Sequence, residues 1–401
     1  MEQQGPSTAA RRMLDSPHDV AVRPRRNCLT TAGFTLHLFT HSSRIYPVNP
    51  VHPVVFDPVH LTLFIPDLLP PSGAESAMAD SGSVLRRMLG RGQRRRFPAI
   101  AAEAWLCQAF EVEQREDWPV AALTAAVDGL VVENEWWLRA DPVHLQLQRH
   151  GTRVMAAPAI TLNEEESVAL STALNAHFGA DGITVAAPHT ARWYIRQDAA
   201  TGLTAPLPST VAGRALPGTP FSGSHASHWH RVLTEAQMVL HEHPLNQARE
   251  ARGLPVINSL LLWGGGRKPA VPGRHFSQIW SNDPLATALA VQSGADSHEA
   301  PGSAALWFGK RPKPDAQHLM TLDRAHHASR YEGPEAWLKA INHLEELWFG
   351  PLWGALDGPL QELVIVATGP EGCLRCTLRR ADKMKIWRRP LTWTTVMSGS
   401  A

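Results

Sequence analysis

The sequence has very few cysteines: four among 401 residues, too few and too scattered for a disulfide framework. This scarcity fits a reducing compartment, so we expect a cytoplasmic protein. The sequence also lacks an apolar run near the roughly 20 residues that a membrane-crossing helix needs. Its first residues do not show the basic segment followed by an apolar segment that marks a secretory signal. We therefore expect no membrane partner.

Net charge is almost absent as well. The 38 basic and 37 acidic residues leave a formal charge of +1, so no overall field favours nucleic acid as a partner. Three catalytic signatures are missing: G-x-S-x-G, the P-loop and H-E-x-x-H. Cys373 and Cys376 form a C-x-x-C pair, but no second pair accompanies it and it falls on a predicted strand. We interpret both cysteines as structural.

The length of the chain suggests about two domains, at roughly 150 residues each. Residues 1–57 differ from the rest because Ser, Thr, Pro and Arg dominate and apolar periodicity is weak. We expect a disordered extension or an appended arm, or translated sequence upstream of the natural start. The predicted organisation is a core from 58–121 and 236–392, an inserted α+β domain from 122–235, and a tail from 393–401.

Residues 258–269, N-S-L-L-L-W-G-G-G-R-K-P, form the most distinctive stretch. The apolar run predicts a buried strand, and the three glycines let the backbone turn sharply and approach a ligand closely. Arg267 and Lys268 would add positive charge there, which suits a phosphate or carboxylate beyond a strand end. The alternative is a tight turn with a solvated basic pair.

Two acids follow predicted strands. Asp67 comes just after the strand 59–65, and Asp323 ends the strand 319–322 and precedes His326 and His327. An acid at the carboxyl end of a strand is well placed to bind a metal ion, although it can also cap the next turn. Among the other predicted elements are a helix from Asn163 to residue 178, a helix over 283–294 and a strand over 305–308.

The order of these motifs resembles the archaeal-type, cofactor-independent phosphoglycerate mutases of the alkaline phosphatase superfamily, and the proteobacterial RpfE-type regulatory proteins. The resemblance rests on I-P-D at 65–67, H-P-L-N-x-x-R at 243–249, L-W-G-G-G-R at 262–267, and Asp323 with His327. It implies an α/β fold with an alkaline-phosphatase-like, mainly parallel sheet between helices and an inserted α+β domain. Residues 139–144, 163–166 and 190–193 match motifs of that insert.

The resemblance also implies a dinuclear metal site, typically with ions about 4 Å apart, and a serine that carries the phosphoryl group. Ser72, Ser76 and Ser81 are the candidates for this nucleophile. Asp67, Asp323 and His327 are the implied metal ligands. The implied ligand is a small phosphorylated or carboxylate molecule, and the implied phosphate-binding residues are Arg139, Arg192, Asn246, Arg249, Asn258, Trp263, Gly264, Gly266 and Arg267.

Several family ligands are missing here. A P-P-H-D element is replaced by L-P-S-T at 207–210, S-D-H is replaced by A-T-G at 367–369, and Leu68 replaces a glycine. Two complete metal sites therefore look unbuildable, whereas one site for Mn or Zn can still be assembled from Asp67, Asp323 and His327.

We therefore favour a degenerate family member that binds an anion and acts as a binding or regulatory protein. One alternative is an active metal-dependent mutase or phosphatase in which His241, His243 or His326 substitutes for a lost ligand. Another is a purely structural partner protein. The sequence leaves the oligomeric state open.

Overall fold

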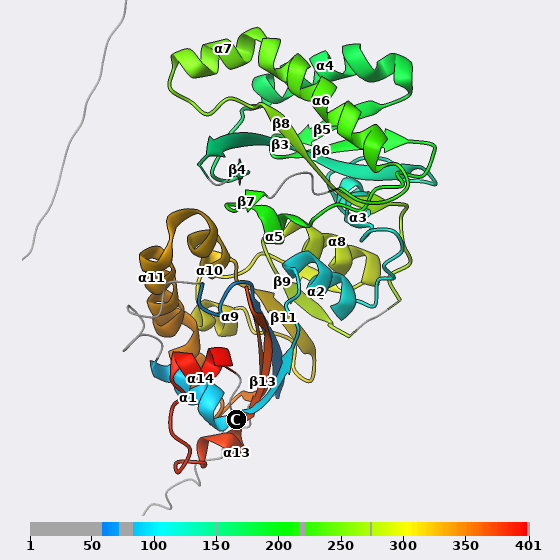
Figure 1. Cartoon of the computed structure of the whole chain (residues 1–401). Helices are drawn as coiled ribbons and strands as arrows, with labels where there is room; N and C mark the ends of the chain where they lie inside the picture. Colours follow the sequence, from blue (N-terminus) through cyan, green and yellow to red (C-terminus); the bar gives the residue numbers. More distant parts are fainter. Residues whose placement is uncertain (1–57, 72–82, 150, 217–220, 273–274, 399–401) are drawn as a thin grey trace, which may run out of the picture. The chain divides into compact units, whose positions relative to one another are not determined.

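The computed structural model describes residues 58–71, 83–149, 151–216, 221–272 and 275–398. The predicted extension, residues 1–57, lies outside these ranges and stays a prediction. The described residues form two β-sheets, one of seven strands and one of six (Figure 1).

The seven-stranded sheet has the order β10-β9-β11-β1-β12-β13-β2. The five strands from β10 to β12 run parallel, and β13 and β2 continue the sheet antiparallel. The strands are β1 (Val59–Ile65), β2 (Gln93–Phe97), β9 (Gln278–Trp280), β10 (Asp296–His298), β11 (Gln317–Thr321), β12 (Leu360–Gly369) and β13 (Gly372–Arg379).

Helices cover both faces of this sheet. Successive side chains of a strand point to opposite faces: Leu63 packs in one buried cluster with Trp307 and Ile341, and Phe64 packs in another with Leu285. This arrangement confirms the predicted α/β class. The helices around the sheet are α1 (Ser83–Arg91), α2 (Ala102–Ala109), α8 (Pro284–Ser293), α9 (Ala304–Gly309), α10 (Arg324–His327), α11 (Pro334–Leu344) and α12 (Gly350–Ala355).

The second sheet is antiparallel and is built on one long strand, β3 (Trp136–Gln148), which pairs with β4, β6 and β8. Its order is β5-β6-β3-β4-β7, with β8 also on β3. The other strands are β4 (Gly151–Met155), β5 (Thr184–His189), β6 (Arg192–Gln197), β7 (Ala215–Leu216) and β8 (Ser259–Gly266).

Three helices lie together on one face of the second sheet: α4 (Glu164–Phe178), α6 (Ala226–Glu242) and α7 (Pro244–Ala251) (Figure 1). The helix predicted from Asn163 is confirmed. The Asn163 side chain accepts from the Glu166 amide at 2.7 Å and the Glu166 side chain accepts from the Asn163 amide at 3.2 Å, a capping box that fixes the start of α4.

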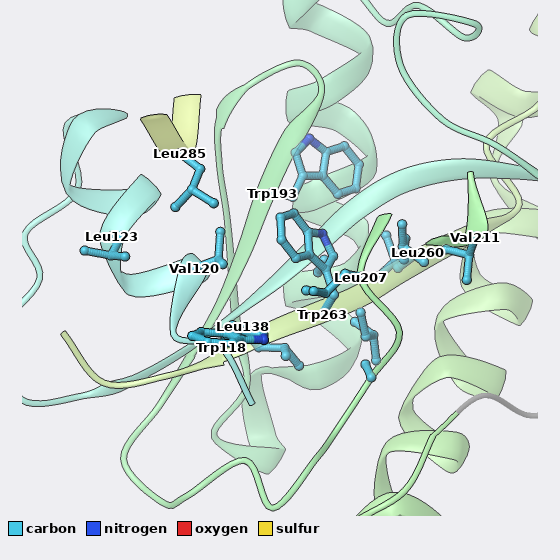
Figure 2. Close-up of a cluster of buried hydrophobic side chains, with 14 of the residues drawn as sticks. Trp118, Val120, Leu123, Leu138, Trp193, Leu207, Val211, Leu260, Trp263 and Leu285 are labelled. Carbon is cyan, nitrogen blue, oxygen red and sulfur yellow. The ribbon is translucent and has the colours of Figure 1, made fainter. Parts of the chain in front are cut away.

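One buried cluster joins the second sheet to α3 (Val120–Val127), α5 (Pro208–Val211) and α8. Figure 2 shows Trp193 and Trp263 among the aliphatic side chains of this cluster, with Leu285 of α8 nearby. Shorter segments are η2 (Gly179–Asp181), the π-helical turns η3 (Ala328–Glu332) and η4 (Glu345–Phe349), α13 (Arg380–Lys383) and α14 (Trp393–Ser398).

Two sequence predictions differ from the structure. The segment predicted as a strand over 305–308 is part of α9, because the Ser303 side chain caps the amide of Leu306 at 3.2 Å and starts a helix. The buried strand predicted before the glycines is confirmed as β8, and Gly264 to Gly266 are its last three residues. This strand pairs with β3 in the second sheet, although residues 236–392 were predicted to belong to the core. The other domain limits stay a prediction.

Candidate functional site

A cleft of about 930 Å³ lies between elements of the two sheets. Its walls include the start of α8 with Asp283, the α10 segment with Asp323 and His326, and Arg139 of β3. Asp323 follows β11, one of the parallel strands. The carboxyl ends of parallel strands are where α/β sheets place ligands. We therefore identify this cleft as the candidate site.

Asp67 lies just beyond β1, next to a smaller recess of about 120 Å³ that shares Ser209 and His326 with the cleft wall. Its backbone adopts φ +52°, a left-handed conformation that Asp tolerates better than most residues. The Asp67 amide donates to the Thr368 hydroxyl at 3.2 Å, and its carbonyl accepts from the indole N–H of Trp337 at 2.9 Å. These two bonds fix the carboxylate toward the recess.

An arginine and a histidine occupy both carboxylate oxygens of Asp67. Arg330, in η3, donates through Nε to Oδ2 at 2.7 Å and through Nη2 to Oδ1 at 3.0 Å. His326 Nδ1 lies 2.7 Å from Oδ2. Burial alone would raise the pKa of Asp67, but the hydrogen bond from His326 and the charges of His326 and Arg330 outweigh it and lower the pKa. Asp67 is thus the anionic partner of the buried Arg330 guanidinium and also contacts the partly exposed His326.

The implied metal ligands do not fit a metal ion in this arrangement. Asp323 and His327 line the cleft, but it is His326 that contacts Asp67. Within the described ranges, no group of three or more His, Cys, Asp and Glu side chains could hold a metal. In addition, Arg330 pairs with the Asp67 carboxylate, which an ion at this position would need as a ligand. The candidate nucleophiles Ser72, Ser76 and Ser81 lie outside the described residues.

Arg139 lines the cleft, but a neighbouring carboxylate holds its guanidinium. Its Nε and Nη2 donate to Asp141 at 2.7–2.9 Å, and its guanidinium lies 4.9 Å from the ring centroid of Trp263 and 5.2 Å from that of Tyr194. The Trp263 indole N–H donates to the same Asp141 at 2.8 Å. The arginine and tryptophan predicted to bind phosphate therefore form one buried network.

Arg192 also lines the cleft and is also paired within the protein. It donates twice to Asp128, at 2.6 and 2.7 Å, and the Tyr194 hydroxyl donates to that carboxylate at 2.6 Å. The ligand-binding role predicted for Arg139, Arg192 and Trp263 stays a prediction. In the structure Trp263 of β8 and Arg139 both bond to Asp141 of β3, whereas Arg192 of β6 bonds to Asp128 at the end of α3.

Three other predicted residues hold backbone segments and lie outside the cleft walls. Asn246 bonds the carbonyls of Leu240 and Ile257 and the amide of Ile257, at 2.7–2.8 Å. Asn258 forms a two-way bridge to the backbone of residue 145. Arg249 donates to Glu166 at 2.6 Å and to two carbonyls. His241 and His243, proposed as substitute metal ligands, also lie outside the cleft walls.

The glycine stretch binds an anion that the protein itself supplies. The amides of Gly264 and Gly265 donate to Oδ2 of Asp117, at 3.1 and 3.4 Å. Gly264 has φ +68°, and a Cβ on Gly266 would lie 2.6 Å from the Cβ of Pro119, so both positions favour glycine. Arg267 lies over the Trp136 ring at 5.3 Å and lines a separate cavity of about 300 Å³.

Asp117 provides a pH prediction. Burial raises its pKa to about 6, even though four backbone amides lower it. Because the pKa is raised on folding, this group's contribution to stability is full below the unfolded pKa of about 4 and is lost as the pH rises through 6. We expect the amide shifts of Gly264 and Gly265 to titrate with a midpoint near 6, as measured by NMR. A midpoint at or below 4 would contradict the burial argument.

The structure adds site residues that sequence reasoning missed. Glu103 of α2 accepts from the amide of Ser209 at 2.9 Å and from its hydroxyl, and burial raises the pKa of Glu103. Arg330 and Arg214 line the recess beside Asp67. No spacing in the sequence marks them, because Arg330 lies 263 positions from its carboxylate partner. His326 had been considered only as a substitute metal ligand.

The C-x-x-C pair lies on β13, and its two cysteines belong to different buried clusters, one on each face of the sheet. Burial raises the pKa of Cys373 to about 11 and that of Cys376 to about 12. Neither thiol can act as a reactive thiolate near neutral pH. The structural interpretation of this pair therefore agrees with the fold.

The chain is structurally similar to the PH0037 protein from Pyrococcus horikoshii. The two share 16% identity and a TM-score of 0.51, over 86% of this chain and 93% of the other. A cofactor-independent phosphoglycerate mutase from Thermoplasma acidophilum DSM 1728 also aligns, with 16% identity and a TM-score of 0.41, over 80% of this chain and 90% of that one. These likenesses concern the fold alone, and the second is too low to establish it.

No protein-family model and no curated sequence matches the chain. The RpfE-type grouping has no support from these comparisons. Among the described residues, no helix has the length and apolar character that crossing a membrane requires.

Proposed function

We propose that this protein binds a small phosphorylated or carboxylate-bearing molecule in the 930 Å³ cleft and acts as a binding or regulatory protein without a dinuclear metal centre. The observation that supports this most directly is the two-bond pairing of Arg330 with Asp67. Dinuclear phosphoryl transfer needs carboxylates that are free to bind ions. Here the first candidate ligand already neutralises a guanidinium.

The cleft walls carry cationic side chains that could bind an anion, among them Arg324 and Lys339. Five acids line the cleft too, and Asp141 among them pairs with Arg139. Burial raises the pKa of Glu103, and burial together with the charge of Asp323 raises the pKa of Asp283. A raised pKa lowers the negative charge that these carboxyls carry. The volume lies in the upper part of the range for small-molecule pockets.

An active metal-dependent mutase or phosphatase is the second candidate. The observation that favours it is that Asp323 and His327 both line the same cleft. In that case His326 would leave Asp67 and Arg330 would move, because a metal ion and a guanidinium cannot share one carboxylate face. The two candidates therefore differ in their dependence on metal.

Metal removal separates the two candidates. We expect the purified protein, after dialysis against EDTA, to bind 3-phosphoglycerate in isothermal titration with unchanged affinity and to leave it unconverted. The physical reason is that cationic side chains, and no bound ion, supply the positive charge of the cleft. Two equivalents of Mn or Zn per chain by elemental analysis, together with turnover of 3-phosphoglycerate, would establish the enzyme instead.

Two variants serve as controls for the same titration. Lys339→Gln removes an exposed cation of the cleft wall and should weaken binding about tenfold, as expected for one charged hydrogen bond. Arg231→Gln changes an exposed cation on α6, outside the cleft walls, and should leave the affinity unchanged. Equal losses in both variants would indicate nonspecific charge attraction and contradict binding in the cleft.

A further inference from the structure

The recess beside Asp67 contains a buried donor that has no partner. Two nitrogens of Arg330 bond to Asp67, but Nη1 is buried and makes no hydrogen bond, although the side chain is only 7% exposed. Buried donors are nearly always satisfied, and leaving one unpaired costs stability. Because Arg330 lines the recess, an acceptor in that space would complete its hydrogen bonding.

The recess also has an excess of positive charge. Arg214 is a second guanidinium in its wall, and burial together with the charge of Arg330 lowers the pKa of Arg214. His326 lies on the same wall, whereas Asp67 is the one carboxylate among the residues that line the recess. One anion therefore faces two arginines and a histidine, so a second anion would balance the charge.

The backbone holds the two arginines in place. Arg153 donates through Nε to the carbonyl of Gly213 and through Nη2 to the carbonyl of Arg330, both at 3.2 Å. Gly213 has φ +69°, and a Cβ there would lie 2.1 Å from the Arg330 carbonyl oxygen. Arg330 itself lies in the π-helical turn η3, and such turns are frequent at functional sites. The backbone segments that carry the two arginines are thus tightly joined, although Arg214 itself is exposed.

The size of the recess fits a single small anionic group. At about 30 Å³ of liquid volume per water, its 120 Å³ corresponds to about four waters. Ser209 and His326 line both the recess and the cleft, so a ligand could extend from one into the other.

We propose that this recess is a subsite for one tetrahedral oxyanion, the phosphoryl group of the cleft ligand or free phosphate, bound by Arg330 Nη1 and Arg214. This inference rests on the proposed function, and it specifies the recess as the place where the anionic group of the ligand binds. Asp67 then serves as a positioning residue that orients Arg330, and the guanidinium pair provides positive charge in place of a metal ion.

Inorganic phosphate, titrated at constant ionic strength and followed by ³¹P NMR, tests the subsite. We expect saturable binding at millimolar concentration, weakened about tenfold or more in Arg214→Gln and unchanged in Arg231→Gln. Within the described ranges the exposed Arg214 side chain forms no hydrogen bond, so Arg214→Gln should leave the fold intact, which circular dichroism checks. Arg330→Lys keeps the charge beside Asp67 but loses Nη1, and should weaken binding likewise. The proposed subsite is wrong if phosphate binding does not saturate, or if Arg214→Gln leaves the affinity for phosphate unchanged.

Comparing 3-phosphoglycerate with glycerate separates this subsite from the proposed function. If both molecules bind equally and Arg214→Gln is neutral, the cleft binds its ligand and the phosphoryl subsite is wrong. If phosphate binds in an Arg214-dependent way but neither glycerate derivative binds, the subsite stands and the small-molecule function fails. A preference for 3-phosphoglycerate that Arg214→Gln removes supports both.

Discussion

Replacing Asp67 by asparagine should lower the free energy of unfolding by about 3–5 kcal/mol, the cost of leaving one member of a buried ion pair without its partner. The side chains of Asp67 and Arg330 are 4% and 7% exposed, so water cannot replace the lost carboxylate. Asparagine tolerates the positive φ of residue 67, so the substitution tests charge and not backbone strain. Urea denaturation at pH 7 measures the effect.

The double variant Asp67→Asn/Arg330→Met is the control for this experiment. Because it removes both charges, it should recover most of the lost stability. A change below about 0.5 kcal/mol in Asp67→Asn would show that the pairing is weak, and would reopen Asp67 to a metal ion.

The pH dependence of the same pair has a defined sign. Folding lowers the pKa of Asp67, because His326 and Arg330 favour its charged form more than burial disfavours it. Its contribution to stability is therefore present above the unfolded pKa near 4 and is lost as the pH falls through the lower folded value. Asp67→Asn should lack this part of the acid sensitivity.

Replacing Asp141 by asparagine should also cost about 3–5 kcal/mol. Arg139, the Trp263 indole and the Trp193 amide all donate to this carboxylate, at 2.7–3.3 Å. Without the charge of Asp141, the Arg139 guanidinium, which is 5% exposed, loses the carboxylate that it bonds directly, although the Thr124 hydroxyl and the rings of Trp263 and Tyr194 remain beside it. Thermal and urea unfolding measure the loss.

Asp296→Asn is the matched control for this second experiment. Asp296 pairs with Lys313 on the surface, where the two side chains are 45% and 61% exposed, and its loss should have no measurable effect. If Asp141→Asn is as stable as the wild type but binds 3-phosphoglycerate more weakly, the Arg139–Asp141 pair contributes to ligand recognition and not to the stability of the second sheet.

Sequence reasoning placed the acids correctly but not their partners. That Asp67 and Asp323 follow parallel strands could be predicted, because apolar runs and the residues after them are local patterns. The glycine stretch was predicted to approach a phosphate or carboxylate ligand beside Arg267 and Lys268, whereas its amides donate to a carboxylate of the protein. That this anion is Asp117, 147 positions away, depends on how α3 packs on β8.

Local rules also failed where two signals compete. Residues 305–308 form a short apolar run that fits a strand or a helix equally. The structure is helical there because the Ser303 side chain caps the start of α9. Arg139, Arg192 and Arg249 were predicted to bind a ligand because arginine favours anions, and that role stays a prediction. In the structure each of them pairs with a carboxylate of the protein.

By itself, the amino-acid sequence determined the α/β class, the capped helices, and the acids that follow the parallel strands, because strand and helix periods and caps act over a few residues. Only the tertiary structure determined which side chains pair with these carboxylates. Arg330 reaches Asp67 through packing between distant segments, and a buried charge is stable only with such a partner. The anion-binding recess therefore depends on the fold and not on a motif.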